Sequence, residues 1–192
     1  GRGPSGPVHL GHLLPWFFTK HMQDVFGAHL YFQMTDDEKF PLNDDLELDT
    51  TIGYTYSNAL DLIATGLDPE KTHIFSDTDD IGHIYRLSLE VAKRITFSTI
   101  RGLFGLEDST NIGMIFFPAI QAVPCFMQSA REDRKVAVII PAAIDQDPYW
   151  RMTRDIAEKM GYYKPAQMHA KFLLGLGAGG KMSASRPETA IF

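Results

Sequence analysis

Hydrophobic and polar positions along the chain fall into blocks that predict helices separated by short strands. The apolar run that begins in HLGHLLPWFF predicts a helix over residues 11–26. Pro15 is tolerated near the first turn of such a helix, and Gly27 can end it. The short aromatic stretch over residues 29–35 suits a strand, which the acidic DDE follows.

A second helix is predicted over residues 49–64, with Gly66 after it as a terminator. THIFSD, residues 72–77, is then typical of a second short strand. The apolar residues of the second helix recur three and four positions apart, which is the spacing of one helix face. These residues are Ile52, Tyr56, Ala59, Leu60 and Ile63.

The segment from about residue 80 to 126 is mainly helical in its pattern. Asn111 or Ser109 is expected to cap a helix there, and Pro118 and Pro124 are expected to break or kink the chain.

The run KVAVIIPA, residues 135–142, is continuously apolar, as expected of a strand buried on both faces. A helix is predicted to follow, with Asp147 as its cap, Pro148 in its first turn and Gly161 at its end. The candidates for its buried side are Trp150, Ile156 and Met160.

This alternation of strands and helices predicts an α/β fold with a parallel sheet, helices on both faces and right-handed crossovers. Ligands of such sheets bind beyond the carboxyl ends of the strands. QMTDDE, SDTDD and PAAIDQDPY each follow a predicted strand, and HLGH opens a helix. We therefore expect these four segments to converge on one crevice.

Composition narrows the class of protein. The 192 residues carry a formal charge of −6 and include one cysteine, Cys125, which we expect to be a small buried hydrophobe. No basic excess drives non-specific nucleic-acid binding, so a nucleic-acid partner requires a local patch or protein outside this chain. No apolar run reaches the roughly 18 to 20 residues of a membrane span, and the first residues lack the apolar stretch and small-residue cleavage site of a signal peptide, so the cytosol is expected. The abrupt ends predict a fragment of a longer protein.

The HLGH segment combines two histidines with a glycine at a predicted helix start. Free N–H groups and about half a positive charge at a helix N-terminus favour phosphate. His9 and His12 are suited to donate hydrogen bonds to a phosphoryl group, and Gly11 allows close approach of a ligand to the backbone. Taken alone, two histidines at this spacing are equally well ordinary surface or core residues. A metal site is disfavoured because no third ligand lies nearby.

The KMSAS segment, residues 181–185, follows the glycine-rich GLGAGG. A lysine flanked by hydroxyl residues on a mobile loop can close over a polyphosphate, with Lys181 as the charge and Ser183 or Ser185 as donors. Considered by itself, the segment is also compatible with a solvated polar loop.

Together, HLGH and KMSAS resemble the paired HIGH and KMSKS signatures of class I aminoacyl-tRNA synthetases, with Ala184 where the usual pattern has a second lysine. QMTDDEKF, FPAIQAVP and AIDQDPYWRMTRDIA are similar to the tryptophanyl members of the archaeal and eukaryotic type, in which KMSAS is the usual form. The resemblance covers nearly the whole chain, and the five motifs stand in family order.

This resemblance implies a Rossmann-type catalytic domain over residues 1–192, with a helical insertion at about 40–110 and without the anticodon-binding domain. A strand and a tyrosine of the indole pocket would precede GRGPS, outside this chain. The implied reaction is activation of L-tryptophan by ATP to tryptophanyl-adenylate, with Mg²⁺ bridging the phosphates, and transfer to tRNA(Trp) by the full-length parent. A cytoplasmic homodimer without a membrane partner is also implied.

The resemblance also assigns roles to single residues. The catalytic residues would be His9, His12, Lys181, Ser183 and Ser185, and no residue is assigned to a metal. ATP would be bound by Arg2 and Gly3 near the α-phosphate, by His9, Gly11, His12, Lys181, Met182 and Ser183, and by Asp145 at a ribose hydroxyl. Tryptophan would be bound by Gln33 at the indole, by Glu38 near the α-amino group, and by Gln121 and Gln146.

Simple chemistry supports the indole assignment. The indole N–H is only a donor and needs an acceptor such as the Gln33 carbonyl. A buried acceptor left unpaired would reject phenylalanine, and sites of this type reach discrimination of roughly 10⁴–10⁵. For Glu38 the alternative is a solvated acidic run, since Asp36 and Asp37 stand beside it.

Three other functions remain open at this point. A tyrosyl-tRNA synthetase shares the fold and chemistry but would place an aspartate at the indole-recognising position, where this chain has Gln33. A nucleotidylyltransferase shares the HxGH helix start but would not explain KMSAS together with QMTDDEK. A catalytically inactive fragment that acts only as a binding module is the third.

Overall fold

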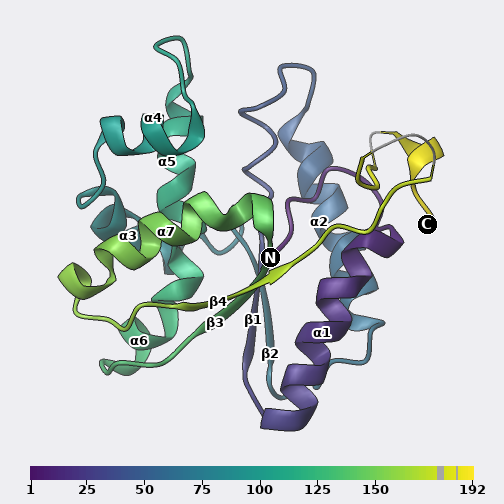
Figure 1. The fold of residues 1–192 in the computed structure, drawn as a ribbon, viewed down its shortest axis with the longest axis horizontal. Helices are drawn as coiled ribbons and strands as arrows, with labels where there is room; N and C mark the ends of the chain where they lie inside the picture. The colour runs from purple at the N-terminus through teal and green to yellow at the C-terminus, as the bar shows by residue number, and fades with distance from the viewer. Residues whose placement is uncertain (177–179, 185) are drawn as a thin grey trace. The chain divides into compact units, whose positions relative to one another are not determined.

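The computed structural model describes residues 1–176, 180–184 and 186–192 (Figure 1), and the chain divides into two compact units. Unit 1 comprises residues 1–78 and 170–192, and unit 2 comprises residues 79–169. The strands among the described residues form two two-stranded sheets, β1–β2 and β3–β4.

Unit 1 is built on a parallel β-α-β arrangement. Its elements are α1 (Leu10–Phe26), β1 (Leu30–Met34), α2 (Leu48–Ile63), β2 (Thr72–Ser76) and the short 3₁₀ helix η4 (Pro187–Thr189). The register of β1 and β2 runs from Leu30 opposite Thr72 to Met34 opposite Ser76. Arg2 adds a further parallel bridge on Met34. The two strands therefore end at the same edge, and QMTDDE and SDTDD emerge there side by side.

The ends of α1 follow the sequence prediction. Gly27 has the left-handed conformation (φ 62°) and its N–H donates to the Gln23 carbonyl, which closes the helix. Pro15 lies inside the helix.

One face of the β1–β2 sheet carries the apolar core of unit 1. Trp16 from α1 and Leu62 from α2 pack with Phe32 and Met34, and Leu67 completes the cluster. Both helices lie on the same side of these two strands (Figure 1). Alternation along β1 turns Tyr31 and Gln33 to the opposite face.

The helix predicted over residues 49–64 is confirmed as α2, but its apolar stripe is not its buried face. Three of the apolar residues at helical spacing are more than half exposed: Tyr56, Leu60 and Ile63. The buried residues of α2 are Thr51, Thr55, Asn58 and Leu62. Asn58 faces the interior of unit 1 because it hydrogen-bonds there to Arg2 and to the Gly6 carbonyl.

Unit 2 is mainly helical. Its elements are α3 (Ile81–Ala92), α4 (Phe97–Phe104), α5 (Ile112–Gln121), η1 (Val123–Cys125), α6 (Met127–Glu132), β3 (Ile139–Ala143), η2 (Ile144–Gln146), α7 (Asp147–Ala157), η3 (Glu158–Met160) and β4 (Ala166–Ala170), the last residue of which belongs to unit 1.

Several expectations for unit 2 are confirmed. Asn111 caps α5 by accepting from the Met114 N–H at 3.0 Å. Pro124 lies in the first turn of η1, after α5 has ended, as expected of a helix break. Pro118 does not break the chain, because it lies inside α5, and a kink at Pro118 remains a prediction. Cys125 is buried, and burial raises the pKa of its thiol, as expected of a structural cysteine.

Other expectations for unit 2 need correction. Strand β3 is shorter than the apolar run and is not buried on both faces, since Ile139 is 42% exposed. Asp147 does not cap α7, because its carboxylate pairs with Arg151 one turn later. Met160 is only half-buried. Strand β4 has no counterpart in the sequence prediction, since AQMHA is too polar to stand out.

The mixed α/β architecture with parallel strands confirms the predicted fold class. The helical insertion proposed for residues 40–110 remains a prediction, because that range crosses from unit 1 into unit 2. Among the described residues, no helix combines the length and the apolar character needed to cross a bilayer.

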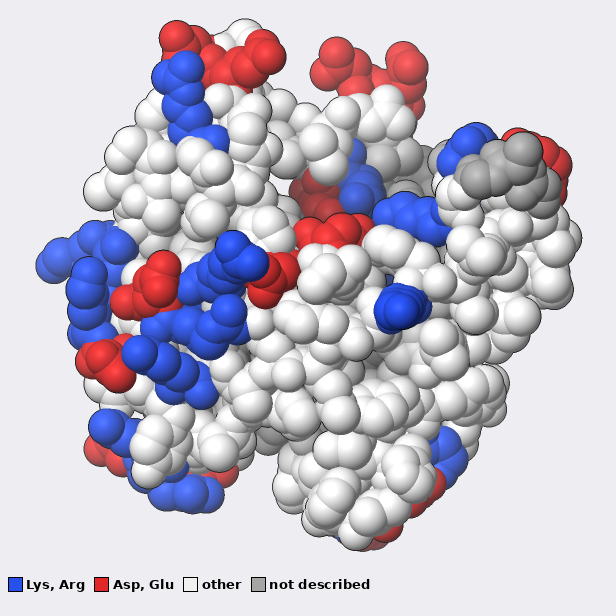
Figure 2. All heavy atoms as spheres, in the orientation of Figure 1, with Lys and Arg blue, Asp and Glu red and all other residues white. Residues whose placement is uncertain are grey.

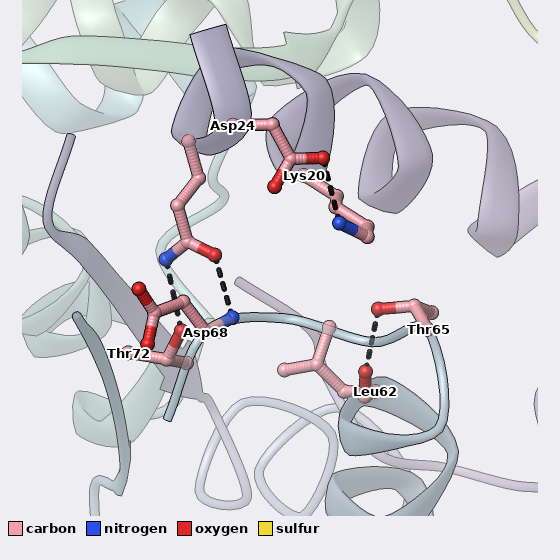
Figure 3. A network of polar contacts seen from close by, with 7 residues as sticks. Lys20, Asp24, Leu62, Thr65, Asp68 and Thr72 are labelled. Atoms are coloured by element: carbon pink, nitrogen blue, oxygen red, sulfur yellow. Dashed lines mark hydrogen bonds and ion pairs between the residues drawn. The ribbon is translucent and has the colours of Figure 1, made fainter. Parts of the chain in front are cut away.

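A buried amide links α1 to the loop before β2 (Figure 3). Gln23 is 3% exposed, and its Nε2 donates to the Thr72 hydroxyl at 3.0 Å while its Oε1 accepts from the Asp68 N–H at 2.8 Å. The nearby ion pair of Lys20 and Asp24 joins two residues one turn apart on α1. Gln23 thus serves both a side-chain acceptor, the Thr72 hydroxyl, and a backbone donor, the Asp68 N–H.

We expect Gln23→Leu to lower the free energy of unfolding by about 1–3 kcal/mol, because it leaves the Asp68 N–H without its acceptor. Urea denaturation followed by circular dichroism measures this loss. Asp24→Asn is the matched control, since breaking the exposed pair with Lys20 should cost less than about 1 kcal/mol. Equal losses in the two variants would contradict the importance assigned to Gln23.

Candidate functional site

The two histidines of HLGH form the N-terminal cap of α1. His9 has an extended backbone (φ −125°, ψ 167°), and its Nδ1 accepts from the Gly11 N–H at 3.2 Å. His12 reaches back, and its Nδ1 accepts from the His9 N–H at 3.1 Å. The two rings stack with centroids 3.7 Å apart. Since His9 Nδ1 is an acceptor, a neutral His9 carries its proton on Nε2.

Arg2 ties three segments of unit 1 together. Its Nη1 lies 2.7 Å from His12 Nε2, and its Nε donates to Asn58 Oδ1 at 2.8 Å. Asn58 is fully buried on α2 and also donates to the Gly6 carbonyl at 3.1 Å. The backbone N–H of Arg2 donates to the Gln33 carbonyl at 2.8 Å.

His12 is placed between two donors. The His9 N–H points at Nδ1 and the Arg2 guanidinium points at Nε2, but a neutral imidazole has only one acceptor nitrogen. Burial, and then the charge of Arg2, lower the pKa of His12 to about 3. The ring is therefore neutral at physiological pH, and one of its nitrogens carries an N–H that faces another donor.

Burial also lowers the pKa of Arg2, to about 10, against the opposing effect of Glu38. The guanidinium remains charged at neutral pH. An anion oxygen beside Arg2 Nη1 and His12 Nε2 would accept from both, so the arrangement is suited to hold an oxygen of a phosphate or a carboxylate.

The KMSAS segment packs against the start of α1. Met182 is buried, and its Cβ lies 3.7 Å from the position that a Cβ on Gly11 would take. In the same way, the Ala184 Cβ lies 3.1 Å from a Cβ position on Gly6. The Leu10 N–H donates to the Ile191 carbonyl at 2.8 Å, which joins the end of the chain to the same turn. The structure thus brings together the two motifs at opposite ends of the chain.

Lys181 and the backbone of Ser183 have defined neighbours. Lys181 Nζ lies 4.6 Å from the centre of the Phe172 ring. The Ser183 carbonyl accepts from the Arg186 N–H at 3.1 Å. Ser185, which the resemblance makes catalytic, lies outside the described residues.

Gln33 lies at the end of β1 and is 3% exposed. Its Nε2 donates at 2.8 Å to Oδ1 of Asp77, which is the residue directly after β2. Asp36 in turn accepts from the Thr78 N–H at 3.1 Å and from its hydroxyl at 2.6 Å. The expected convergence of QMTDDE and SDTDD is confirmed.

Glu38 is a structured residue, because its side chain is only 19% exposed. Its Oε2 accepts from the Thr35 hydroxyl at 2.9 Å, and its Oε1 pairs with Lys39 Nζ at 2.8 Å. Glu38 Oε2 also lies close to the Gly3 backbone, where a Cβ on Gly3 would displace it. The alternative of a solvated acidic run is therefore wrong for Glu38.

The remaining candidates belong to unit 2. Gln121 is the last residue of α5 and is half-buried, and the half-buried Gln146 precedes α7. Asp145 lines a cavity of about 490 Å³ together with Leu103 and Arg151. Whether these residues meet those of unit 1, as the expected single crevice requires, remains a prediction.

Sequence reasoning missed two hydrogen-bond partners of the predicted site residues in unit 1. Asn58 accepts from the Arg2 Nε–H, and Asp77 accepts from the Gln33 Nε2–H. The signal for Asn58 is its place in line with Thr51 and Thr55, a polar stripe at helical spacing. Asp77 lies in SDTDD, whose position after a strand was recognised without singling out one carboxylate.

Comparisons with known proteins agree with this geometry. The family model described as class I tRNA synthetases (W and Y) matches residues 1–192. The curated tryptophan–tRNA ligase of Thermococcus sibiricus is 53% identical over 193 residues, which is all of this chain and 48% of the relative. The ligase of Pyrobaculum calidifontis is 50% identical, with 51% of its length covered. The chain thus spans about half the length of these curated relatives.

Solved structures give the same result. A product-bound parasite tRNA synthetase superposes with a TM-score of 0.93 at 40% identity, covering all of this chain and 52% of that one. The tryptophanyl-tRNA synthetase of Encephalitozoon cuniculi bound to tryptophan gives 0.90 at 36% identity, covering all of this chain and 55% of that one. Because the family model matches every residue and these folds coincide, the chain belongs to the class I tRNA synthetases of the W and Y family.

Proposed function

We propose that this chain contributes the ATP site and part of the amino-acid site of an enzyme that activates L-tryptophan. In the proposed reaction the tryptophan carboxylate attacks the α-phosphorus of ATP, and pyrophosphate leaves with the bonding electron pair. A hydroxyl of the terminal ribose of tRNA(Trp) then attacks the acyl carbon of tryptophanyl-adenylate, and AMP leaves. The observation that carries the proposal is the packing of Met182 against Gly11, which joins KMSAS to HLGH.

The phosphates of ATP would lie at the start of α1. Arg2 Nη1 and His12 Nε2 face one another, and both can be donors. A phosphate oxygen beside them would accept a hydrogen bond from each. The Nε2–H of His9 and the ammonium of Lys181 are the further donors proposed for the leaving pyrophosphate. Gly11 leaves room for the nucleotide beside the backbone. Ser183 and Ser185 are proposed to assist on the same loop.

Mg²⁺ is proposed to arrive with ATP. Among the described residues, no three or more His, Cys, Asp or Glu side chains are grouped to hold a metal ion. Phosphate oxygens are the usual ligands of Mg²⁺ in nucleotide sites, so a protein cage is not needed. When bound, the ion would neutralise charge on the phosphates.

The formal charge is distributed unevenly between the two units, which bears on how tRNA would be bound. Unit 1 has seven Lys and Arg against thirteen Asp and Glu, and unit 2 has eleven of each, so the formal charge of −6 lies on unit 1. Basic side chains gather over α7 in unit 2 with acidic ones among them (Figure 2), and Arg151 there pairs with Asp147. Recognition of tRNA is therefore proposed to depend mainly on the rest of the enzyme.

Tryptophan is favoured over tyrosine as the substrate. Gln33 offers a side-chain carbonyl oxygen, the acceptor that an indole N–H needs. Glu38, Gln121 and Gln146 are proposed to hold the amino-acid end, and Asp145 the ribose. The relatives are named as tryptophan–tRNA ligases, which also argues against a nucleotidylyltransferase and against an inactive binding module. A homodimer in the cytoplasm is proposed from the family resemblance.

The first prediction concerns the activity itself. The chain should catalyse exchange of labelled pyrophosphate into ATP that depends on tryptophan and Mg²⁺. The Thermococcus sibiricus ligase is the positive control. Exchange stimulated by tyrosine would contradict the specificity, and exchange without any amino acid would contradict the reaction class. If only the control is active, this chain does not hold a sufficient site.

The second prediction concerns His12. Its N–H should contribute most when charge develops on the transferring phosphoryl group, so His12→Ala should lower the exchange rate by roughly 10²–10³ while the KM for ATP changes less than about threefold. His21→Ala is the matched control, because His21 is an exposed histidine on the same helix. Equal losses in rate and in ATP affinity would mean that His12 only binds ground-state phosphate.

The third prediction uses the low pKa of His12. The unfolded chain takes up a proton near pH 6.5, whereas folded His12 does so only at about 3. Relative to His12→Gln, the wild type should therefore lose stability as the pH falls from 6.5 to 5, by roughly 1 kcal/mol per pH unit or less. Urea denaturation at a series of pH values measures the difference. A wild type that gains stability over this range would show that His12 is protonated in the fold.

A further inference from the structure

We propose that Asp77 is a positioning residue for amino-acid recognition: it fixes the amide of Gln33 so that the carbonyl oxygen, and not the NH₂ group, faces the indole N–H. This inference rests on the proposed function and concerns its specificity. The carrying observation is the 2.8 Å hydrogen bond from Gln33 Nε2 to Asp77 Oδ1.

The hydrogen bond is held by the sheet and is shielded from water. Gln33 and Asp77 are 3% and 1% exposed, and they follow neighbouring parallel strands. The Asp77 N–H donates to the Met34 carbonyl at 3.1 Å, which fixes the backbone beside Gln33. A competing water is excluded from this contact, so the carboxylate determines the orientation of the amide.

A second carboxyl group keeps Asp77 in place. Asp77 Oδ2 and Asp37 Oδ1 are buried oxygens, and no described residue offers a donor to either. Two carboxyl groups satisfy one another when they share a proton. Burial and the neighbouring Asp37 raise the pKa of Asp77, and burial raises the pKa of Asp37 to about 6. A shared proton leaves Asp77 Oδ1 available as the acceptor for Gln33.

The orientation matters because a glutamine amide presents opposite chemistry at its two ends. Rotation by half a turn about the last torsion exchanges a carbonyl acceptor for an NH₂ donor. Since Asp77 offers an acceptor to Gln33, the NH₂ end is assigned to Asp77 and the carbonyl end to the substrate. Without Asp77, both orientations of the amide become possible, and one of them presents a donor to the indole N–H.

The test compares two near-isosteric variants. Asp77→Asn keeps an oxygen that accepts from Gln33 and an N–H that donates to Asp37, whereas Asp77→Leu removes the acceptor. Tryptophan and 3-benzothienylalanine, which has sulfur in place of the indole N–H, are the paired ligands. Affinity is measured by equilibrium dialysis on the 192-residue chain, and unfolding is measured by thermal denaturation. Asp77→Ala replaces Asp77→Leu if the latter does not fold.

We expect the preference of the wild type for tryptophan over the sulfur analogue to survive in Asp77→Asn within about twofold and to fall about tenfold in Asp77→Leu. The loss should lie in tryptophan binding, with the analogue nearly unaffected. In a Gln33→Ala background, Asp77→Leu should have no further effect on the preference. Asp36→Asn is the control for a buried carboxylate that binds Thr78 instead of Gln33, and it should keep the preference.

An unchanged preference in Asp77→Leu or Asp77→Ala would overturn the positioning role. So would equal weakening of both ligands, because it would indicate only a structural contribution. If the wild type binds neither ligand, the failure lies with the proposed function of this chain, and both proposals fall. The two failures are therefore distinguished by the wild type alone.

Discussion

The hydrogen bonds of Arg2 are the interactions on which the rest of unit 1 depends. The backbone of Arg2 extends the β1 edge, and its side chain contacts the start of α1 through His12 and the middle of α2 through Asn58. Arg2 is half-buried, and withdrawing a cation from water is costly unless it is hydrogen-bonded. Burial lowers the pKa of Arg2 and the opposite charge of Glu38 offsets this effect. The same cation thus orders the scaffold and prepares an anion site.

The need of Arg2 for hydrogen-bond partners explains why α2 buries polar side chains on the face where a helix usually buries apolar ones. A helix of this length normally buries its apolar stripe, but α2 turns Thr55 and Asn58 inward and leaves Leu60 exposed. Asn58 must face inward because it accepts from Arg2 and donates to the Gly6 carbonyl. Hydrophobic periodicity predicts that the helix exists. It cannot predict which face is buried when a long-range polar contact, such as that of Asn58 with Arg2, determines the orientation of the helix.

Local chemistry made much of the fold predictable. Gly27 and Asn111 mark helix ends through interactions within a few residues, and the strands and motifs around Gln33 stand out in the same way. The contact of Gln33 with Asp77 spans 44 residues and depends on the register of two strands. No local pattern encodes that register. Sequence reasoning therefore recognised the SDTDD segment but could not identify Asp77 as the partner of Gln33. Strand β4 was missed because its composition is polar.

The electrostatics of the helix start favour a site that responds to developing charge. Unit 1 is acidic as a whole, so distant charges do not attract a polyphosphate, and close donors must hold it. Two of the proposed donors are His9 and His12, and burial and the charge of Arg2 lower the pKa of both rings. Neutral donors bind a ground-state anion less strongly than full charges do, but they strengthen as negative charge grows on the oxygen they face. Fixing His9 and His12 against each other at the cap means that little reorganisation is needed when that charge appears.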